Sequence, residues 1–119
     1  MRHPEHRVCK VKVTCNDDDK DIEVIESYGG QKGGEEGQLN EPCHMALSRN
    51  GFVFVADFNN GRVVTLDPSL RFVRAFTGGA ARGREMDRFQ RLCLDNESQT
   101  LYIGDYKGDV TILRLTWNH

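Results

Sequence analysis

The chain has 119 residues, of which 38% are hydrophobic and 29% are charged, and its formal net charge at pH 7 is -2. This length and composition suit about one ordinary globular domain, which excludes fibrous repeats and wholesale disorder. The charge gives no general attraction to nucleic acid or membrane. No apolar run approaches the roughly 18 residues of a membrane helix, and the start lacks a signal peptide's apolar segment. We expect a cytoplasmic protein without membrane contact.

Two alternating segments open the chain, CKVKVTC at residues 9–15 and DIEVIES at residues 21–27. The alternation predicts two strands, with Cys9 and Val11 on one face of the first. The NDDDKD run at residues 16–21 predicts a solvated hairpin tip, because the spacing and glycine of a calcium loop are absent. The four cysteines show no C-x-x-C pair or zinc spacing, which indicates reduced thiols.

The next segments repeat each other. HMALSRNGFVFVADFNNGRVVTL, from residue 44, aligns with RLCLDNESQTLYIGDYKGDVTIL, from residue 91, with one residue gained in the first turn and one lost in the second. In this alignment Leu47 matches Leu94 and Val55 matches Ile103. The N-terminal part follows the pattern of GRVVTLDPSLRFVRAFTGG, so that its Arg7 matches Arg62 and its Tyr28 matches Phe76. The chain therefore contains parts of three copies of one unit.

Each complete unit reads as four short strands separated by turns. The dipeptides Asn50-Gly51 and Asn60-Gly61 tolerate positive φ and are typical of tight hairpins. A period of about 47 residues with four strands per copy is the pattern of a β-propeller blade.

The residues L-N-E-P, M-A-L-S, G-F-V-F-V-A-D and N-N-G-R-V, in this order, resemble the NHL repeat. The copy at residues 37–79 matches nearly throughout; the copy at residues 84–115 is weaker, with Phe89 in place of Pro42 and Gly104 in place of Ala56. The resemblance implies an all-β chain with about two and a half four-stranded antiparallel blades of an NHL-type β-propeller, not a closed ring.

The predicted units are the last two strands of a preceding blade with a connector at residues 1–36, a complete blade at 37–79, and a connector with three strands at 80–119. Propellers close with typically about four to eight blades. We therefore expect a fragment of a longer protein, or a chain that needs further blades from the same or another chain.

Asp57 and Arg62 stand at a strand end and a strand start, and the position of Asp57 recurs as Asp105. A residue that recurs in each copy usually serves the unit, so we predict structural roles for all three. Asp57 is expected to accept hydrogen bonds from the amides of residues 59–61, and Arg62 to pair with a carboxylate of the same or a neighbouring blade. The second copy has Asp109 at the position of Arg62 and must stabilise its turn differently.

Two glycine-rich connectors join one repeat unit to the next. Their net charges are -2 at residues 29–41 and +2 at residues 78–91. Neither has the spacing of a phosphate-binding loop. Arginines beside aromatic side chains suit an acidic protein partner or, as a second candidate, RNA. The candidate ligand contacts are Phe58, Arg82, Arg84, Arg88, Arg91 and Tyr106.

The histidines are scattered and no catalytic motif is present, so we expect no catalytic residue, no metal site and no cofactor. The predicted function is that of a non-catalytic module that recognises protein or RNA. The NHL resemblance implies the substrate-recognition part of a tripartite-motif, ubiquitin-ligase-type protein. The alternative is part of a metal-dependent six-bladed propeller enzyme of lactonase or lyase type, which requires inward-pointing ligands from several blades.

Overall fold

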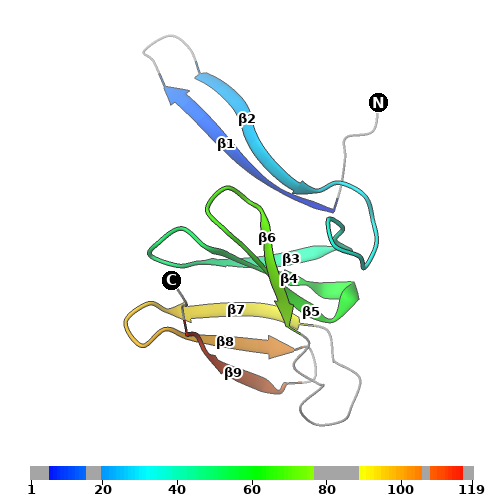
Figure 1. The fold of residues 1–119 in the computed structure, drawn as a ribbon, viewed down its shortest axis with the longest axis vertical. Helices are drawn as coiled ribbons and strands as arrows, with labels where there is room; N and C mark the ends of the chain where they lie inside the picture. Colours follow the sequence, from blue (N-terminus) through cyan, green and yellow to red (C-terminus); the bar gives the residue numbers. More distant parts are fainter. Residues whose placement is uncertain (1–5, 16–19, 77–88, 106–107, 117–119) are drawn as a thin grey trace.

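The computed structural model describes residues 6–15, 20–76, 89–105 and 108–116. These residues form three antiparallel sheets (Figure 1), with strand orders β1-β2, β3-β4-β5-β6 and β7-β8-β9. The strands are β1 Arg7–Cys15, β2 Lys20–Gly29, β3 Pro42–Leu47, β4 Val53–Asp57, β5 Arg62–Leu66, β6 Phe72–Phe76, β7 Phe89–Asp95, β8 Thr100–Asp105 and β9 Val110–Arg114.

Sheets of two, four and three strands, none of them closed into a barrel, confirm the predicted all-β fold of partial propeller blades. The boundaries drawn between the units stay a prediction, and most of the second connector, residues 77–88, lies outside the described residues. Within the described part of the chain, no helix is long and apolar enough to cross a membrane.

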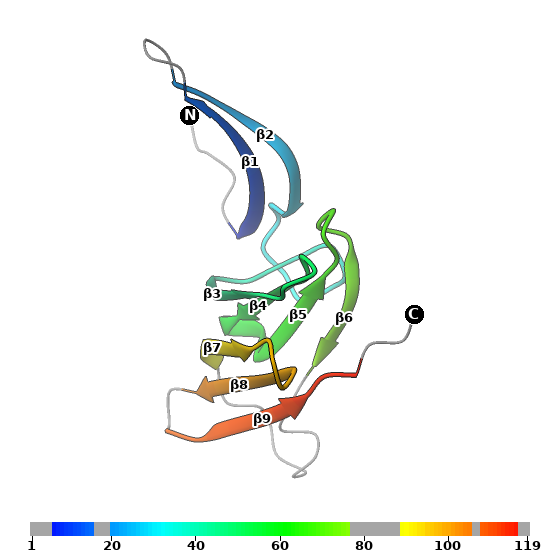
Figure 2. The ribbon, with the colours of Figure 1, turned by 90° about the vertical axis from the view of Figure 1, so that its left-hand side faces the viewer.

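The middle sheet lies between the other two sheets (Figure 2), and its central strands β4 and β5 are buried on both faces. Every residue of β4 is buried. Because side chains alternate along a strand, Val53 and Val55 join a core with Val8 of the first sheet. Phe54 and Ala56 join a second core with residues of the third sheet. This continuous apolar run is typical of a strand buried on both faces.

Tight turns join the strands of the middle sheet. Gly51 lies between β3 and β4 with a φ of 92°. The connection from β4 to β5 is a short 3-10 turn, Phe58–Asn60, which Gly61 closes with a φ of 60°. Glycine adopts such angles at the lowest steric cost, and both positions agree with the hairpins expected from the two Asn-Gly pairs.

The connector between the first two sheets contributes to the core, which the sequence pattern did not predict. Leu39 is fully buried beside Val8 and Tyr28 of the first sheet. A backbone bridge between Lys32 and Leu39 folds the connector into a compact loop. The hydroxyl of Tyr28 accepts a hydrogen bond from the amide of Gly37 at 2.8 Å. The connector is thus packed against the sheets and held by them.

Candidate functional site

The carboxylate of Asp57 contacts the backbone of the connector face, the surface formed by residues 30–41 and the turn after β4. Asp57 is fully buried. Its Oδ1 accepts a hydrogen bond from the amide of Asn40 at 2.6 Å. Its Oδ2 accepts from Nδ2 of Asn60 at 2.7 Å and from Nε of Arg62 at 2.8 Å.

This partner set differs from the expected one. The amides of Asn59 and Gly61 donate elsewhere, to the carbonyls of Asn40 and Phe58. The turn supplies one of these acceptors and the preceding connector the other, so the carboxylate is left to bind the amide of Asn40. A carboxylate that accepts three hydrogen bonds binds its surroundings firmly, since bonds to an ionised group are among the stronger ones in proteins.

The guanidinium of Arg62 binds two backbone carbonyls of the same connector. Nη1 donates to the carbonyl of Gly34 at 2.9 Å, and Nη2 donates to the carbonyl of Gln38 at 2.8 Å. Asn60 adds a third contact, because its Nδ2 also donates to the carbonyl of Gly33 at 2.7 Å. Arginine suits this task because its planar group donates in several fixed directions at once.

Asp57, Asn60 and Arg62 therefore form a connector clamp, the name used below for these three side chains. The acid of the pair is buried, and the side chain of the base is only 12% exposed. Their polar atoms already bind the backbone and each other. This geometry commits the polar atoms of the pair to contacts within the protein.

The second copy has Asp109 at the position of Arg62, and this residue contacts Asp105 across the turn. Oδ1 of Asp105 accepts a hydrogen bond from the amide of Asp109 at 2.9 Å, and the two residues also pair through their backbones. Asp105 is half-buried. An aspartate that binds an amide a few residues later is a common way to close a turn. This contact stabilises the turn where the arginine of the first copy is missing.

The predicted ligand contacts lie in different settings. Phe58 is half-buried in the 3-10 turn beside the clamp. Arg91 is exposed on β7, opposite Gly104 of β8. Arg82, Arg84, Arg88 and Tyr106 lie outside the described residues. The arginine and aromatic cluster therefore stays a prediction.

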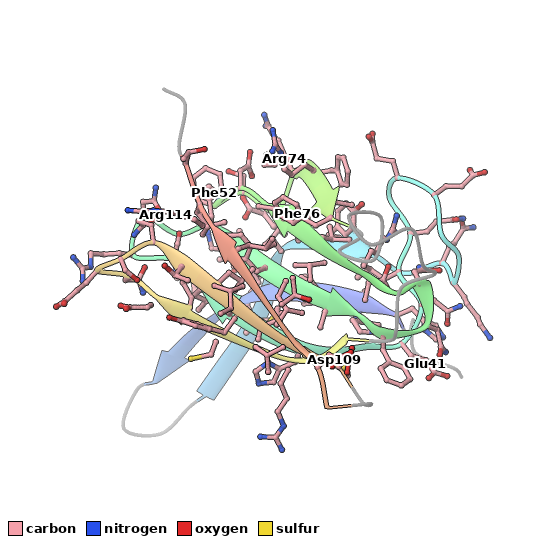
Figure 3. The ribbon with its side chains drawn as sticks, turned by 90° about the horizontal axis from the view of Figure 1, so that it is seen from below. Glu41, Phe52, Arg74, Phe76, Asp109 and Arg114 are labelled. Carbon is pink, nitrogen blue, oxygen red and sulfur yellow. The ribbon has the colours of Figure 1, made fainter. Side chains whose placement is uncertain are left out.

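The connector face carries exposed charges of both signs. Lys32 and three glutamates, Glu35, Glu36 and Glu41, are exposed on the first connector. Figure 3 places Glu41 and Asp109 toward one side of the stack, with Phe52 and Arg114 toward the opposite side. The described part of this face is thus mainly acidic.

Sequence reasoning missed a pocket of about 460 Å³ between the start of β1 and β3. Its lining residues are Arg7, Val8, Cys9, Pro42, Cys43, His44 and Met45. Burial raises the pKa of the Cys43 thiol, with a smaller opposing effect from a backbone hydrogen bond. Nδ1 of His44 accepts a hydrogen bond from the amide of Leu92 at 2.9 Å, which ties β3 to the third sheet.

Metal ligands do not gather in the described part of the chain. Within residues 6–15, 20–76, 89–105 and 108–116, no group of three or more His, Cys, Asp or Glu side chains is arranged to hold a metal ion.

Comparison with known proteins gives one partial similarity. No family model matches the chain. Over 58 residues the chain is 36% identical to the RING finger protein nhl-1 of Caenorhabditis elegans. The aligned part is 49% of this chain but only 6% of that protein. The match agrees with the NHL-type resemblance of the repeat over about half of the chain.

Proposed function

We propose that this chain is a non-catalytic binding module, part of an NHL-type propeller, that recognises a protein partner through the connector face. One observation carries the proposal: the connector clamp ties the backbone of residues 33–40 to the middle sheet. A loop held in one conformation loses little entropy when a partner binds it. The side chains that project from it are consequently presented in a fixed arrangement.

Charge favours protein over RNA as the partner. Glu35 and Glu36 are exposed side by side on the first connector, against the single positive charge of Lys32. Negative groups next to a binding surface repel the phosphates of RNA, whereas they attract the basic side chains of a protein partner. The arginines expected on the second connector would then face acidic groups of the same partner.

We further propose that this binding module is the substrate-recognition part of a ubiquitin-ligase-type protein. This part of the proposal rests on the partial similarity to a RING finger protein. The aligned part is a small share of that protein, so the ligase role is a hypothesis about a longer protein that would include this chain.

Affinity capture with matched variants tests the connector face. Glu35→Lys with Glu36→Lys reverses two exposed charges on it, while Glu23→Lys with Glu97→Lys makes the same change at exposed positions elsewhere. We expect at least one protein that the wild type and the control variant capture, that the connector variant loses, and that binds the wild type when purified. Identical captured sets from all three proteins would contradict the proposal.

A binding titration with labelled single-stranded RNA of random sequence tests the competing partner class. We expect no binding that weakens steeply with salt. Tight, salt-dependent binding that disappears when Arg82, Arg84 and Arg88 are changed to glutamate would assign the surface to RNA instead.

A further inference from the structure

A histidine joins the first strand of the middle sheet to the first strand of the third sheet. β3 and β7 lie side by side where these two sheets meet (Figure 1). Nδ1 of His44 on β3 accepts a hydrogen bond from the amide of Leu92 on β7 at 2.9 Å. The side chain of Leu92 is only 5% exposed and belongs to the second core. The bond therefore adjoins the apolar contact between the two sheets.

The same arrangement occurs where the first sheet meets the start of the middle sheet. Nδ1 of His6, the residue before β1, accepts a hydrogen bond from the amide of Glu41, the residue before β3, at 2.9 Å. In both places a histidine ring accepts a backbone amide that belongs to the next sheet or leads into it. Two successive junctions between sheets therefore depend on the same chemical group.

The amide donors fix which form of imidazole these bonds require. A backbone amide only donates, so the ring nitrogen opposite it must offer a lone pair. Neutral imidazole has one such nitrogen, whereas the protonated ring has an N–H on both nitrogens and accepts nothing. Histidine is the side chain that ordinarily takes up its proton between about pH 5 and pH 8. Mild acid is thus sufficient to remove the acceptor from each bond.

The charges around the two rings decide whether another contact could replace these bonds. On the elements packed around His44, the charged and titratable side chains are Arg7 and Cys9 of β1, Cys43 of β3, Asp57 of β4, and Arg91, Cys93 and Asp95 of β7. The carboxylate of Asp57 is bound in the connector clamp, and that of Asp95 is bound in its own turn. Among the described residues of this set, both carboxylates are engaged elsewhere, so no ion pair replaces the bond that protonation removes.

The surroundings of His6 differ in one respect. The charged side chains of the segments that it joins are Arg7 of β1 and Lys32, Glu35, Glu36 and Glu41 of the connector. The exposed carboxylate of Glu41, next to the amide that His6 binds, can attract the protonated ring. We therefore expect the first junction to respond to acid more weakly than the second.

Each junction also contains a hydrogen bond whose acceptor does not titrate. The amide of Arg49 in the β3–β4 turn donates to Oδ1 of Asn96 in the β7–β8 turn at 2.7 Å. The amide of Gly30 donates to the backbone carbonyl of His6 at 3.0 Å. These bonds and the apolar cores remain when the rings gain a proton. Acid should therefore open each junction locally and leave the sheets attached.

We propose that His6 and His44 make the packing of consecutive sheets sensitive to pH. Each ring closes its junction while it is neutral and releases the amide of the next sheet when it takes up a proton. The inference concerns contacts between sheets, so it does not depend on the connector-face partner.

NMR of the 15N-labelled 119-residue chain tests the proposal between about pH 7.5 and about pH 5. The 15N shifts of the ring nitrogens report the protonation of each histidine. Hydrogen exchange, expressed as a protection factor, reports each amide bond. As His44 gains its proton, the protection of the Leu92 amide should fall by about fivefold or more, and that of the Glu41 amide should fall by less when His6 does so.

Matched controls lie within the same chain. The amides of Arg49 and Gly30 should keep their protection, because their acceptors do not titrate in this range. In the variant His44→Asn, Oδ1 is attached to Cγ as Nδ1 is in histidine, and it accepts without titrating. The Leu92 amide of this variant should be protected equally at both ends of the pH range.

Four results would overturn the proposal for the second junction. They are a His44 ring that stays neutral down to about pH 5, a protonated ring with an unchanged Leu92 amide, equal losses at Leu92 and Arg49, or the wild-type loss in His44→Asn. The same criteria apply to His6, with Glu41 and Gly30 as the reporting and control amides. The connector variant Glu35→Lys with Glu36→Lys should respond to pH as the wild type does. Failure of this proposal and failure of the connector-face function are therefore distinguishable.

Discussion

Nε of Arg62 lies 2.8 Å from Oδ2 of Asp57, and this pair joins a hairpin of the middle sheet to the connector that precedes it. The carboxylate binds the amide of Asn40 while the guanidinium binds the carbonyls of Gly34 and Gln38. Both residues therefore serve the packing of one unit on the next. In the structure this charged pair is a contact between the hairpin and the connector.

Replacement of Asp57 by asparagine should lower the free energy of unfolding by about 3 kcal/mol, because it leaves a buried arginine side chain without its counter-charge. Asp105→Asn is the matched control in the second copy. Its side chain is half-buried and accepts a hydrogen bond from the amide of Asp109, so a loss of about 1 kcal/mol is expected. Urea denaturation monitored by circular dichroism measures both, and equal losses would contradict a special role for Asp57.

The variant Arg62→Lys should loosen the connector without disturbing the sheets. Lysine keeps the charge but loses the fork that reaches the carbonyls of Gly34 and Gln38. Hydrogen exchange should become faster at the amides of Gly37 and Gln38 and stay unchanged at Val64. Uniform acceleration through the sheet would instead mean that the pair stabilises the whole unit.

Phe54→Ala should cost about 3 to 5 kcal/mol of stability, because the side chain is fully buried between two sheets. Tyr102 occupies the same repeat position in the third sheet but is 39% exposed. Tyr102→Ala should therefore cost clearly less, below about 1.5 kcal/mol. Similar losses from thermal or urea unfolding would show that the outer face of the third sheet is covered in solution.

Asp95 should make the free energy of unfolding depend on pH in the acidic range. The hydroxyl of Ser98 and the amide of Glu97 donate to its carboxylate and hold the pKa of Asp95 below its usual value. A lowered pKa in the folded state stabilises the protein above the unfolded pKa, and this stabilisation is lost as the pH falls through the folded pKa. Ser98→Ala should reduce the drop in urea midpoint between roughly pH 5 and pH 2. An unchanged drop would exclude the contact as a contributor.

Cys43 should react slowly with iodoacetamide at neutral pH. The residue is exposed at the surface, but partial burial of its thiol raises the thiol's pKa, so the reactive thiolate is scarce and the rate should rise as the pH increases. Mass spectrometry of the folded chain against the same residue in urea measures the difference. Equal rates in the two states would contradict the raised pKa.

The repeat in the sequence was sufficient to predict the strands and their grouping. The recurrence of VFVAD as LYIGD and the two Asn-Gly turns led to β4 and its neighbours, and the sheets of two, four and three strands confirm that prediction. These features are local or recur at a fixed period, so one sequence contains enough information to find them.

The contacts of the connector could not be predicted in the same way. Leu39 is fully buried, yet it stands alone in a polar, glycine-rich segment without periodicity. The bond from Asn40 to Asp57 spans 17 positions and depends on how the loop folds back. The exposure of Met45 and Leu47 likewise depends on which strands lie beside them, which no pattern within β3 reveals.

A double-mutant cycle tests the central claim most directly. Unfolding free energies of the wild type, Asp57→Asn, Arg62→Gln and the double variant give the coupling between the two side chains. We predict a coupling of at least about 1.5 kcal/mol, since the pair is buried and charged. A coupling below about 0.5 kcal/mol would show that the two residues act independently, and would contradict the structural role assigned to them.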